Sequence, residues 1–137
     1  MIKMMNKIEQ LKLSEDGFTL IEMMIVVAII AILTAIALPK FNESLAMTNT
    51  SRVQADLQSL DTAIAMYKVQ NNRAPQDISD LDEYIDVENI KAPTGDVYVN
   101  GVLTSNEMGE NYSLNSDKTN ATFKGKTRME FGKNTGE

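Results

Sequence analysis

One apolar stretch, from Phe18 to Leu38, constrains the fold of this chain more than any other feature. It contains 21 residues, and Pro39 follows it directly. Its only polar members are Thr19, Glu22 and Thr34. As an α-helix the stretch would be roughly 30 Å long, which is the thickness of the hydrocarbon core of a bilayer. The sequence therefore predicts a helix that is long and apolar enough to cross a membrane.

Two interpretations explain the stretch without giving Glu22 a role. One is a cleavable signal peptide, because Ala35-Ile36-Ala37 forms a cleavage motif and three lysines precede the stretch. However, the run is longer than usual for such a peptide, and acidic residues stand before it. The other is a plain anchor with its N-terminus inside, which the leading lysines favour. A carboxylate at the centre of a spanning helix costs about 2.5–3.5 kcal/mol, less near an end, and a plain anchor has no use for it.

A third interpretation makes Glu22 central. If the chain were cut after Gly17, Phe18 would carry a free α-amine, which is positively charged at neutral pH. The carboxylate of Glu22 would lie one turn further along the same helix face, within roughly 6 Å of rise. The two charges could pair within one chain or between neighbouring chains, and a pair in low dielectric fixes register even when its net energy is small. This interpretation predicts a subunit whose helix stacks against copies of itself.

The run Gly17-Phe18-Thr19-Leu20-Ile21-Glu22, followed by Met, Ile, Val and Ala residues, resembles the prepilin signature. That signature marks type IV pilins and the pseudopilins of type II secretion or competence, and this chain is most similar to a small major pseudopilin. The resemblance implies cleavage between Gly17 and Phe18 by a membrane aspartyl prepilin peptidase/methyltransferase, with N-methylation of Phe18. It also implies that Glu22 assists docking and register in a helical filament. Acidic residues, Glu15 and Asp16, precede Gly17 where the family commonly has a basic one.

Beyond Pro39 the pattern of an amphipathic helix resumes, and Asn71-Asn72 is its predicted stop. Its apolar members are Phe41, Leu45, Val53, Leu57, Leu60, Ile64 and Tyr67. We expect this apolar stripe to pack on the C-terminal half of the chain, with a self-associating coiled coil as the alternative. A proline interrupts helical hydrogen bonding. In pilin-like proteins a proline in this place is where the helix loosens in the filament, and the resemblance implies that role for Pro39.

The C-terminal half carries strand and turn signals. Residues 97–99 and 102–104 flank Asn100-Gly101, which predicts a hairpin with a type I′ turn. Residues 112–114 and 121–124 alternate as two further strands, and residues 127–131 offer another. The sequence therefore predicts an α+β, pilin-like fold. In that fold a long N-terminal α-helix, its first half transmembrane, packs on a small antiparallel sheet of three to four strands.

These signals give an expected organisation of five parts. Residues 1–17 form a cleaved prepilin leader, and residues 18–39 form the transmembrane, filament-core half of the long helix. Residues 40–72 form its amphipathic half, residues 73–131 a small α+β head, and residues 132–137 a flexible tail.

Composition narrows the chemistry that the chain can perform. There is no Cys and no His, which removes disulfides, thiol nucleophiles, Cys/His zinc sites and imidazole catalysis. No nucleophile–base pair or glycine-rich phosphate loop is present either, so we expect no enzymatic activity. The net charge of −6 argues against nucleic acid as the main partner, because phosphate binding requires clustered Lys and Arg.

The acidic residues concentrate in one segment. Asp77, Asp80, Asp82, Glu83, Asp86 and Glu88 follow one another without a basic residue between them. A solvated acidic face is the simplest interpretation, and a cation-binding patch is the alternative, although no EF-hand spacing is present. Pro93, Gly95 and Tyr98 resemble a proline–glycine–aromatic stretch that can sit near a calcium site in major pseudopilins. The tryptophan expected there is absent and no ligand set emerges, so we expect no cofactor and no dedicated calcium site.

The function predicted by these features is that of a structural subunit of a type IV pilus-like filament. The resemblance implies a single-pass protein of the cytoplasmic (inner) membrane, with the head outside, which then enters an extracytoplasmic filament. Its implied partners are the prepilin peptidase, copies of itself and other pilins, and an inner-membrane assembly platform. The alternative is a membrane-anchored binding module for adhesion, DNA uptake or secretion cargo. A type IV pilus, a type II secretion pseudopilus and a competence filament all fit the residues.

Overall fold

The computed structural model describes residues 17–133 of the chain. The predicted leader up to residue 16 and the predicted tail from residue 134 onward lie outside the described residues. The chain divides into two compact units between Leu38 and Pro39.

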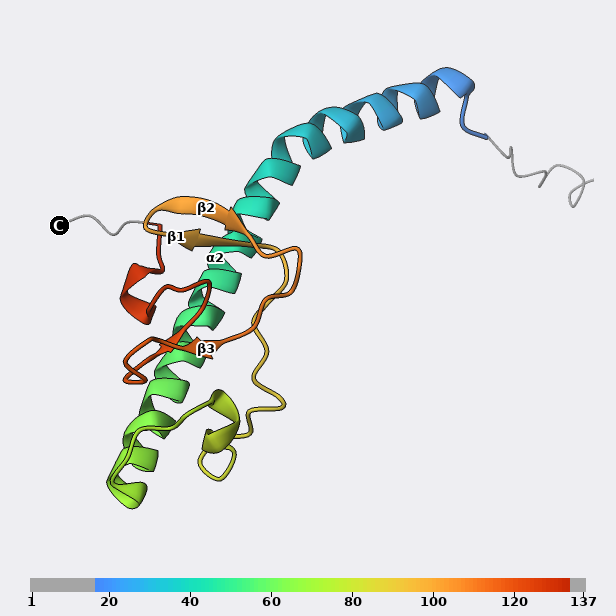
Figure 1. Cartoon of the computed structure of the whole chain (residues 1–137). Coiled ribbons are helices and arrows are strands. Elements are labelled where there is room, and N and C mark those ends of the chain that lie inside the picture. The colour runs from blue at the N-terminus through green and yellow to red at the C-terminus, as the bar shows by residue number, and fades with distance from the viewer. Residues whose placement is uncertain (1–16, 134–137) are drawn as a thin grey trace, which may run out of the picture. The chain divides into compact units, whose positions relative to one another are not determined.

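One helix, α2, runs from Leu20 to Asn71 and contains 52 residues (Figure 1). Pro39 lies inside it. The helix ends where the Asn71-Asn72 pair predicted, and the reason is visible in the backbone. Asn72 has a φ of 50°, the left-handed conformation that commonly follows the last helical residue and that asparagine tolerates better than most side chains.

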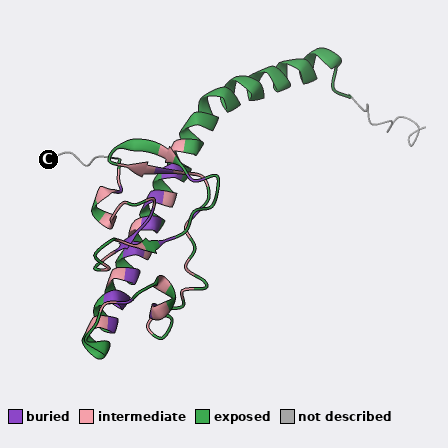
Figure 2. Cartoon of the chain, in the orientation of Figure 1, coloured by how far each residue is buried: buried purple, intermediate pink, exposed green. Residues whose placement is uncertain are grey.

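The first unit is an apolar helix without any covering layer of its own. Every residue from Leu20 to Leu38 is exposed (Figure 2). Among the described residues, α2 is the one helix long and apolar enough to cross a membrane by length and composition. A helix that is hydrophobic all round requires either lipid or other protein around it.

The second unit is built on the remainder of α2, whose buried face is almost the predicted stripe. Val53, Leu57, Leu60, Ile64 and Tyr67 are buried, together with Ala46, Thr50 and Ala63. The prediction was wrong for the first two members of the stripe. Phe41 and Leu45 are 60% and 47% exposed, because burial against the C-terminal half begins only at Ala46.

The predicted hairpin is present. Strand β1 (Asp96–Val99) pairs antiparallel with β2 (Val102–Ser105), and Val99 lies opposite Val102. The two turn residues, Asn100 and Gly101, have φ angles of 48° and 78°, as a type I′ turn requires. The second predicted strand pair is also present but short, with β3 (Ser113–Leu114) antiparallel to β4 (Ala121–Thr122).

The four strands form two two-stranded sheets instead of the expected single sheet. The predicted last strand, residues 127–131, is instead a 3₁₀ turn, η3 (Arg128–Glu130), followed by one bridge between Phe131 and Val99. The reason is local, because the Glu130 carboxylate accepts a hydrogen bond from the Thr127 N–H at 2.8 Å and closes a turn. Lys124, expected in a strand, lies in a tight turn with a φ of 52°.

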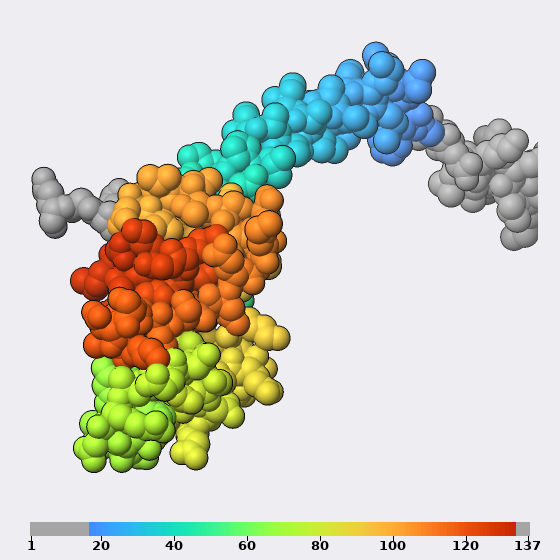
Figure 3. Space-filling model, viewed as in Figure 1, coloured from blue at the N-terminus to red at the C-terminus, as the bar shows by residue number. Residues whose placement is uncertain are grey.

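Aromatic side chains from the C-terminal half fill the core against α2. Phe123 is fully buried, and its ring centroid lies 5.7 Å from that of Tyr112 and 5.9 Å from that of Phe131. Leu81, from the 3₁₀ helix η2 (Ile78–Leu81), completes the core near the end of α2. Figure 3 shows the C-terminal residues (orange to red) packed beside the end of α2 and the segment that follows it (green to yellow).

Candidate functional site

The predicted processing residues precede the helix in an exposed segment. Gly17 and Phe18 belong to no helix or strand, and the Phe18 side chain is 82% exposed. A Cβ added at Gly17 would meet no atom within 4 Å. Both residues are exposed in the part of the chain that the structure describes. The peptide bond between them is therefore accessible to a second protein.

Glu22 lies in the first turn of α2 and makes a reciprocal set of contacts with Thr19. The Thr19 N–H and hydroxyl donate to Oε2 of Glu22 at 2.7 and 2.8 Å. In return, the Glu22 N–H donates to the Thr19 hydroxyl at 3.2 Å. This is a capping box, in which two backbone N–H groups at a helix start are satisfied by side chains.

The sequence analysis missed this contact, although the signal was present. Thr19 and Glu22 form the T-x-x-E pattern that typically starts a helix, and it stands directly before an apolar run. A carboxylate at this position also interacts favourably with the positive end of the helix dipole. The Glu22 carboxylate thus has hydrogen-bond donors within its own chain. Both hydrogen bonds from Thr19 are accepted by the same oxygen, Oε2.

Pro39, the remaining predicted site residue, lies within the helix and is exposed. Because proline has no N–H, the carbonyl four residues earlier, that of Ala35, receives no helical hydrogen bond from it. The boundary between the two compact units falls directly before this proline. Pro39 is therefore a position inside α2 where one helical hydrogen bond is missing.

Local hydrogen bonds account for half of the carboxylates in the acidic segment, two of them at the start of η2. The N–H of Gln76 donates to Asp80 at 2.7 Å, and Asp77 accepts from Ser79 at 3.5 Å, which fixes the start of η2. Asp86 accepts from the Asn89 side chain at 2.6 Å. These contacts favour a structural origin for the acidic residues.

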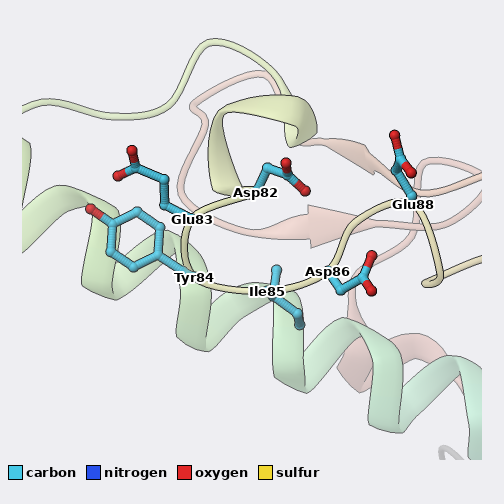
Figure 4. Close-up of a pocket in the computed structure, with 6 residues that line it drawn as sticks. All are labelled: Asp82, Glu83, Tyr84, Ile85, Asp86 and Glu88. Carbon is cyan, nitrogen blue, oxygen red and sulfur yellow. The ribbon is translucent and has the colours of Figure 1, made fainter.

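The other three acidic side chains, together with Asp86, border an open hollow. Asp82, Glu83, Asp86 and Glu88 line it together with Tyr84 and Ile85 (Figure 4). The carboxylates of Glu83 and Glu88 point outward in different directions. Across residues 17–133, no three acidic side chains lie close enough to hold a metal ion.

The stretch that resembles the calcium-associated loop is organised by asparagine side chains. The Asn106 amide, which is 1% exposed, donates to the Pro93 carbonyl at 2.8 Å. The Asn49 amide donates to the carbonyls of Thr94 and Asp96 at 3.3 and 3.1 Å. Backbone carbonyls in this loop therefore face amide N–H groups, and the sequence analysis identified neither asparagine.

A polar network joins the helix to the second strand pair. The Tyr112 hydroxyl donates to Asp56 at 2.6 Å, and Arg52 lies 3.9 Å from the same carboxylate. Burial of the ring, reinforced by the hydrogen bond to Asp56, raises the pKa of Tyr112 well above its usual value. This contact ties β3 to α2 and needs no catalytic role to explain it.

Comparison with known proteins matches both the N-terminal signature and most of the chain. Residues 13–38 match the family model described as the prokaryotic N-terminal methylation motif. The chain is 33% identical over 116 residues to the type IV major fimbrial protein FimA of Dichelobacter nodosus, an alignment that covers 81% of this chain and 70% of the relative. No solved structure is matched significantly.

Two further relatives are a competence protein and a type II secretion system protein. The chain is 33% identical over 95 residues to the competence protein ComGC of Halalkalibacterium halodurans, covering 68% of this chain and 93% of the relative. It is 32% identical over 74 residues to the type II secretion system core protein G of Aeromonas hydrophila, covering 54% and 52%.

Proposed function

The chain belongs to the type IV pilin and pseudopilin family, and on this basis we propose that it is a structural subunit that polymerises through its N-terminal helix into an extracytoplasmic filament. The observation that carries the proposal is the uncovered apolar half of α2 with one capped carboxylate at its start. Such a surface is stable only in lipid or against other apolar helices. A subunit that moves from a membrane into a filament meets both environments.

Processing precedes assembly in this proposal. The exposed bond between Gly17 and Phe18 is cut by a prepilin peptidase, and the new amine of Phe18 is methylated. Mass spectrometry of the protein purified from producing cells tests this directly. We expect a chain that starts at N-methylated Phe18, and we expect Gly17→Val to retain the leader while Asp16→Ala does not. A mature N-terminus after Ala37 would instead identify a signal peptide.

Before assembly, the proposed subunit spans the cytoplasmic membrane once, with residues 40 onward on the outside. Protease treatment of intact spheroplasts should then degrade the head, whereas the apolar helix stays with the membrane. Protection of the head in intact spheroplasts and its degradation only after lysis would contradict this orientation.

Glu22 provides the test of the assembly step itself. We propose that the Glu22 carboxylate receives the positively charged N-terminus of a neighbouring subunit, so that charge fixes the axial register. Glu22→Ala should leave membrane insertion intact and abolish incorporation into filaments, measured by electron microscopy and shearing of surface fibres. Glu22→Gln keeps a hydrogen-bond acceptor without the charge and separates capping from charge pairing. Normal filaments from both variants would overturn the assignment.

A deletion experiment separates the proposed function from its alternative. A membrane-anchored binding module would also insert and span the membrane, but filaments would form without it. Deleting the chain therefore decides between the two, because loss of all fibres identifies a main filament subunit. Normal fibres together with lost adhesion, DNA uptake or secretion identify a binding module.

A further inference from the structure

The end of the described chain contacts α2 directly after its proline. Lys133, the last residue that the structure describes, forms an ion pair with Glu43. Glu43 lies four residues beyond Pro39 and is the first residue after that proline that is not fully exposed. The two partners are 90 residues apart in the sequence, so the ion pair joins distant parts of the second unit.

Backbone hydrogen bonds fix the position of Lys133. The N–H of Asn100 donates to the Glu130 carbonyl at 2.6 Å, and the N–H of Gly101 donates to the Gly132 carbonyl at 3.0 Å. Gly132 in turn donates to the Tyr98 carbonyl at 3.1 Å. The segment 130–132 is thus paired with the β1–β2 turn, and Figure 3 shows it (red) directly beside the hairpin (orange).

Side chains add to this anchoring. Phe131 is 2% exposed in the core, and its carbonyl accepts a hydrogen bond from the Gln54 side chain. The Lys133 ammonium also lies 5.9 Å from the centroid of the Tyr98 ring, within the range of a cation–π contact. The ammonium group is therefore presented to α2 by a segment that is itself held by the core.

Besides Lys133, the helix segment around Glu43 is supported within itself by an ion pair between Lys40 and Glu43 at 3.5 Å. Residues 40–42, 44 and 45 are exposed, and burial begins at Ala46. Pro39 removes one helical hydrogen bond at the start of this segment. Any opening of α2 that begins at Pro39 can therefore proceed through the next turn unless something holds Glu43.

We propose that Glu43 and Lys133 form a C-terminal latch, a reversible contact that stops the opening of α2 at the turn after Pro39. With the latch closed, the turn after the proline is tied to the head. With the latch open, residues 40–45 can unwind, and each residue that passes from helix to extended chain lengthens the segment by about 1.8 Å. The latch is thus a conformational device that sets how far the helix can extend under axial load. The proposed latch depends only on contacts within the second unit. It does not depend on which kind of filament the chain enters.

The strength of the contact suits a reversible device. Both side chains are partly exposed, at 32% for Glu43 and 49% for Lys133. The hydrogen bond and charge of Lys133 lower the pKa of the Glu43 carboxyl, so both groups are charged at neutral pH. Exposed ion pairs change an opening equilibrium by roughly 1.5- to 5-fold, and high salt weakens them.

Hydrogen exchange measured by mass spectrometry on the full chain in detergent micelles tests the latch. In Lys133→Ala at low salt, we expect the amides of residues 40–46 to exchange about 1.5- to 5-fold faster, while those of residues 53–64 stay unchanged. The unchanged core also shows that the variant is folded. Lys133→Arg should keep the protection, because it retains the cation.

Lys126→Ala is the matched control. It removes a cation of the same C-terminal segment, one that pairs with Glu130 at 3.1 Å. We expect no faster exchange in residues 40–46. Equal exchange in wild type and Lys133→Ala, or an equal increase in Lys126→Ala, would overturn the proposal.

Salt gives a second measurement with its own internal control. Raising the ionic strength to about 1 M should speed exchange of residues 40–46 more in the wild type than in Lys133→Ala, which keeps only the Lys40–Glu43 pair. An equal response in both proteins would mean that the sensitivity lies elsewhere, and the latch would be wrong. Neither outcome depends on filament formation, so failure of the latch and failure of the proposed function can be told apart.

Discussion

Thr19 donates both its backbone N–H and its hydroxyl to one oxygen of Glu22, Oε2, at 2.7 and 2.8 Å. The carboxylate is therefore held at the start of α2 by its own chain. Its orientation is thus set within one chain, and its other oxygen carries no bond from Thr19.

Replacing Thr19 by Ala should weaken assembly without removing the charge of Glu22. The variant loses the hydroxyl of the N-cap, which is worth about 0.5–2 kcal/mol of helix stability. We expect fewer or shorter fibres by electron microscopy at equal protein levels in the membrane. Thr19→Ser keeps the hydroxyl and should behave like the wild type. Identical fibres from Thr19→Ala would show that capping does not matter for assembly.

Pro39→Ala should stiffen the middle of α2. The substitution restores the N–H that can donate to the Ala35 carbonyl and removes a ring that crowds the preceding turn, an effect of about 3 kcal/mol in helix interiors. We expect slower hydrogen exchange in residues 35–42 and filaments that extend less under force in optical tweezers. Unchanged exchange and unchanged extension would remove Pro39 as the soft point.

Asn106→Ala should destabilise the second unit. The buried amide bonds the Pro93 carbonyl, and its oxygen accepts from the Glu110 N–H at 3.1 Å. Each buried group left unsatisfied costs about 1–3 kcal/mol, and 1 kcal/mol lowers the Tm of a domain of this size by about 4–8 °C. Asn89→Ala, at an exposed position, is the control and should change the Tm little.

The same loop yields a prediction for calcium. The amides of Asn49 and Asn106 already donate hydrogen bonds to the backbone carbonyls of Pro93, Thr94 and Asp96. We therefore do not expect these carbonyls to bind added calcium. We expect the same Tm with calcium chloride and with a chelator. An upward shift of the Tm with calcium, absent with magnesium, would contradict this account of the loop.

Stability should fall at alkaline pH because of Tyr112. Burial and the hydrogen bond to Asp56 raise the pKa of this phenol in the folded state above its unfolded value, so the folded state holds the proton more tightly. The stabilisation is complete below about pH 10, where unfolded tyrosine titrates, and is lost as the pH rises beyond it. Denaturant unfolding at pH 8 and pH 11 should show this loss in the wild type. The pH-dependent part should be smaller in Tyr112→Phe, and an equal slope in both would exclude Tyr112 as its source.

The features that the sequence predicted well depend on local patterns. The spacing of Val53, Leu57, Leu60, Ile64 and Tyr67 fixed which face of α2 is buried, because a helix repeats every 3.6 residues. Asn100-Gly101 identified the hairpin because few other pairs accept two positive φ angles. Neither inference needed information about distant parts of the chain.

The features that were missed were of two kinds. Residues 127–131 alternate like a strand, but the hydrogen bond between Thr127 and Glu130 closes a turn first. The contacts of Asn106 with Pro93 and of Lys133 with Glu43 join residues that are distant in the sequence. No repeating pattern in the sequence predicts such contacts. The capping box at Thr19 follows from a local pattern, but the prediction for Glu22 concerned only its charge and its role between subunits.

The uncovered apolar half of α2 has a further consequence for the life of a subunit. Transfer of so many large apolar side chains into water would cost on the order of tens of kcal/mol. Under the proposed function, this cost disfavours a free subunit in aqueous solution as an intermediate, both when a fibre grows and when it shortens. The proposal then requires that each subunit passes directly between the bilayer and the base of the fibre. It follows from the proposal that fibre length is controlled at the end that touches lipid.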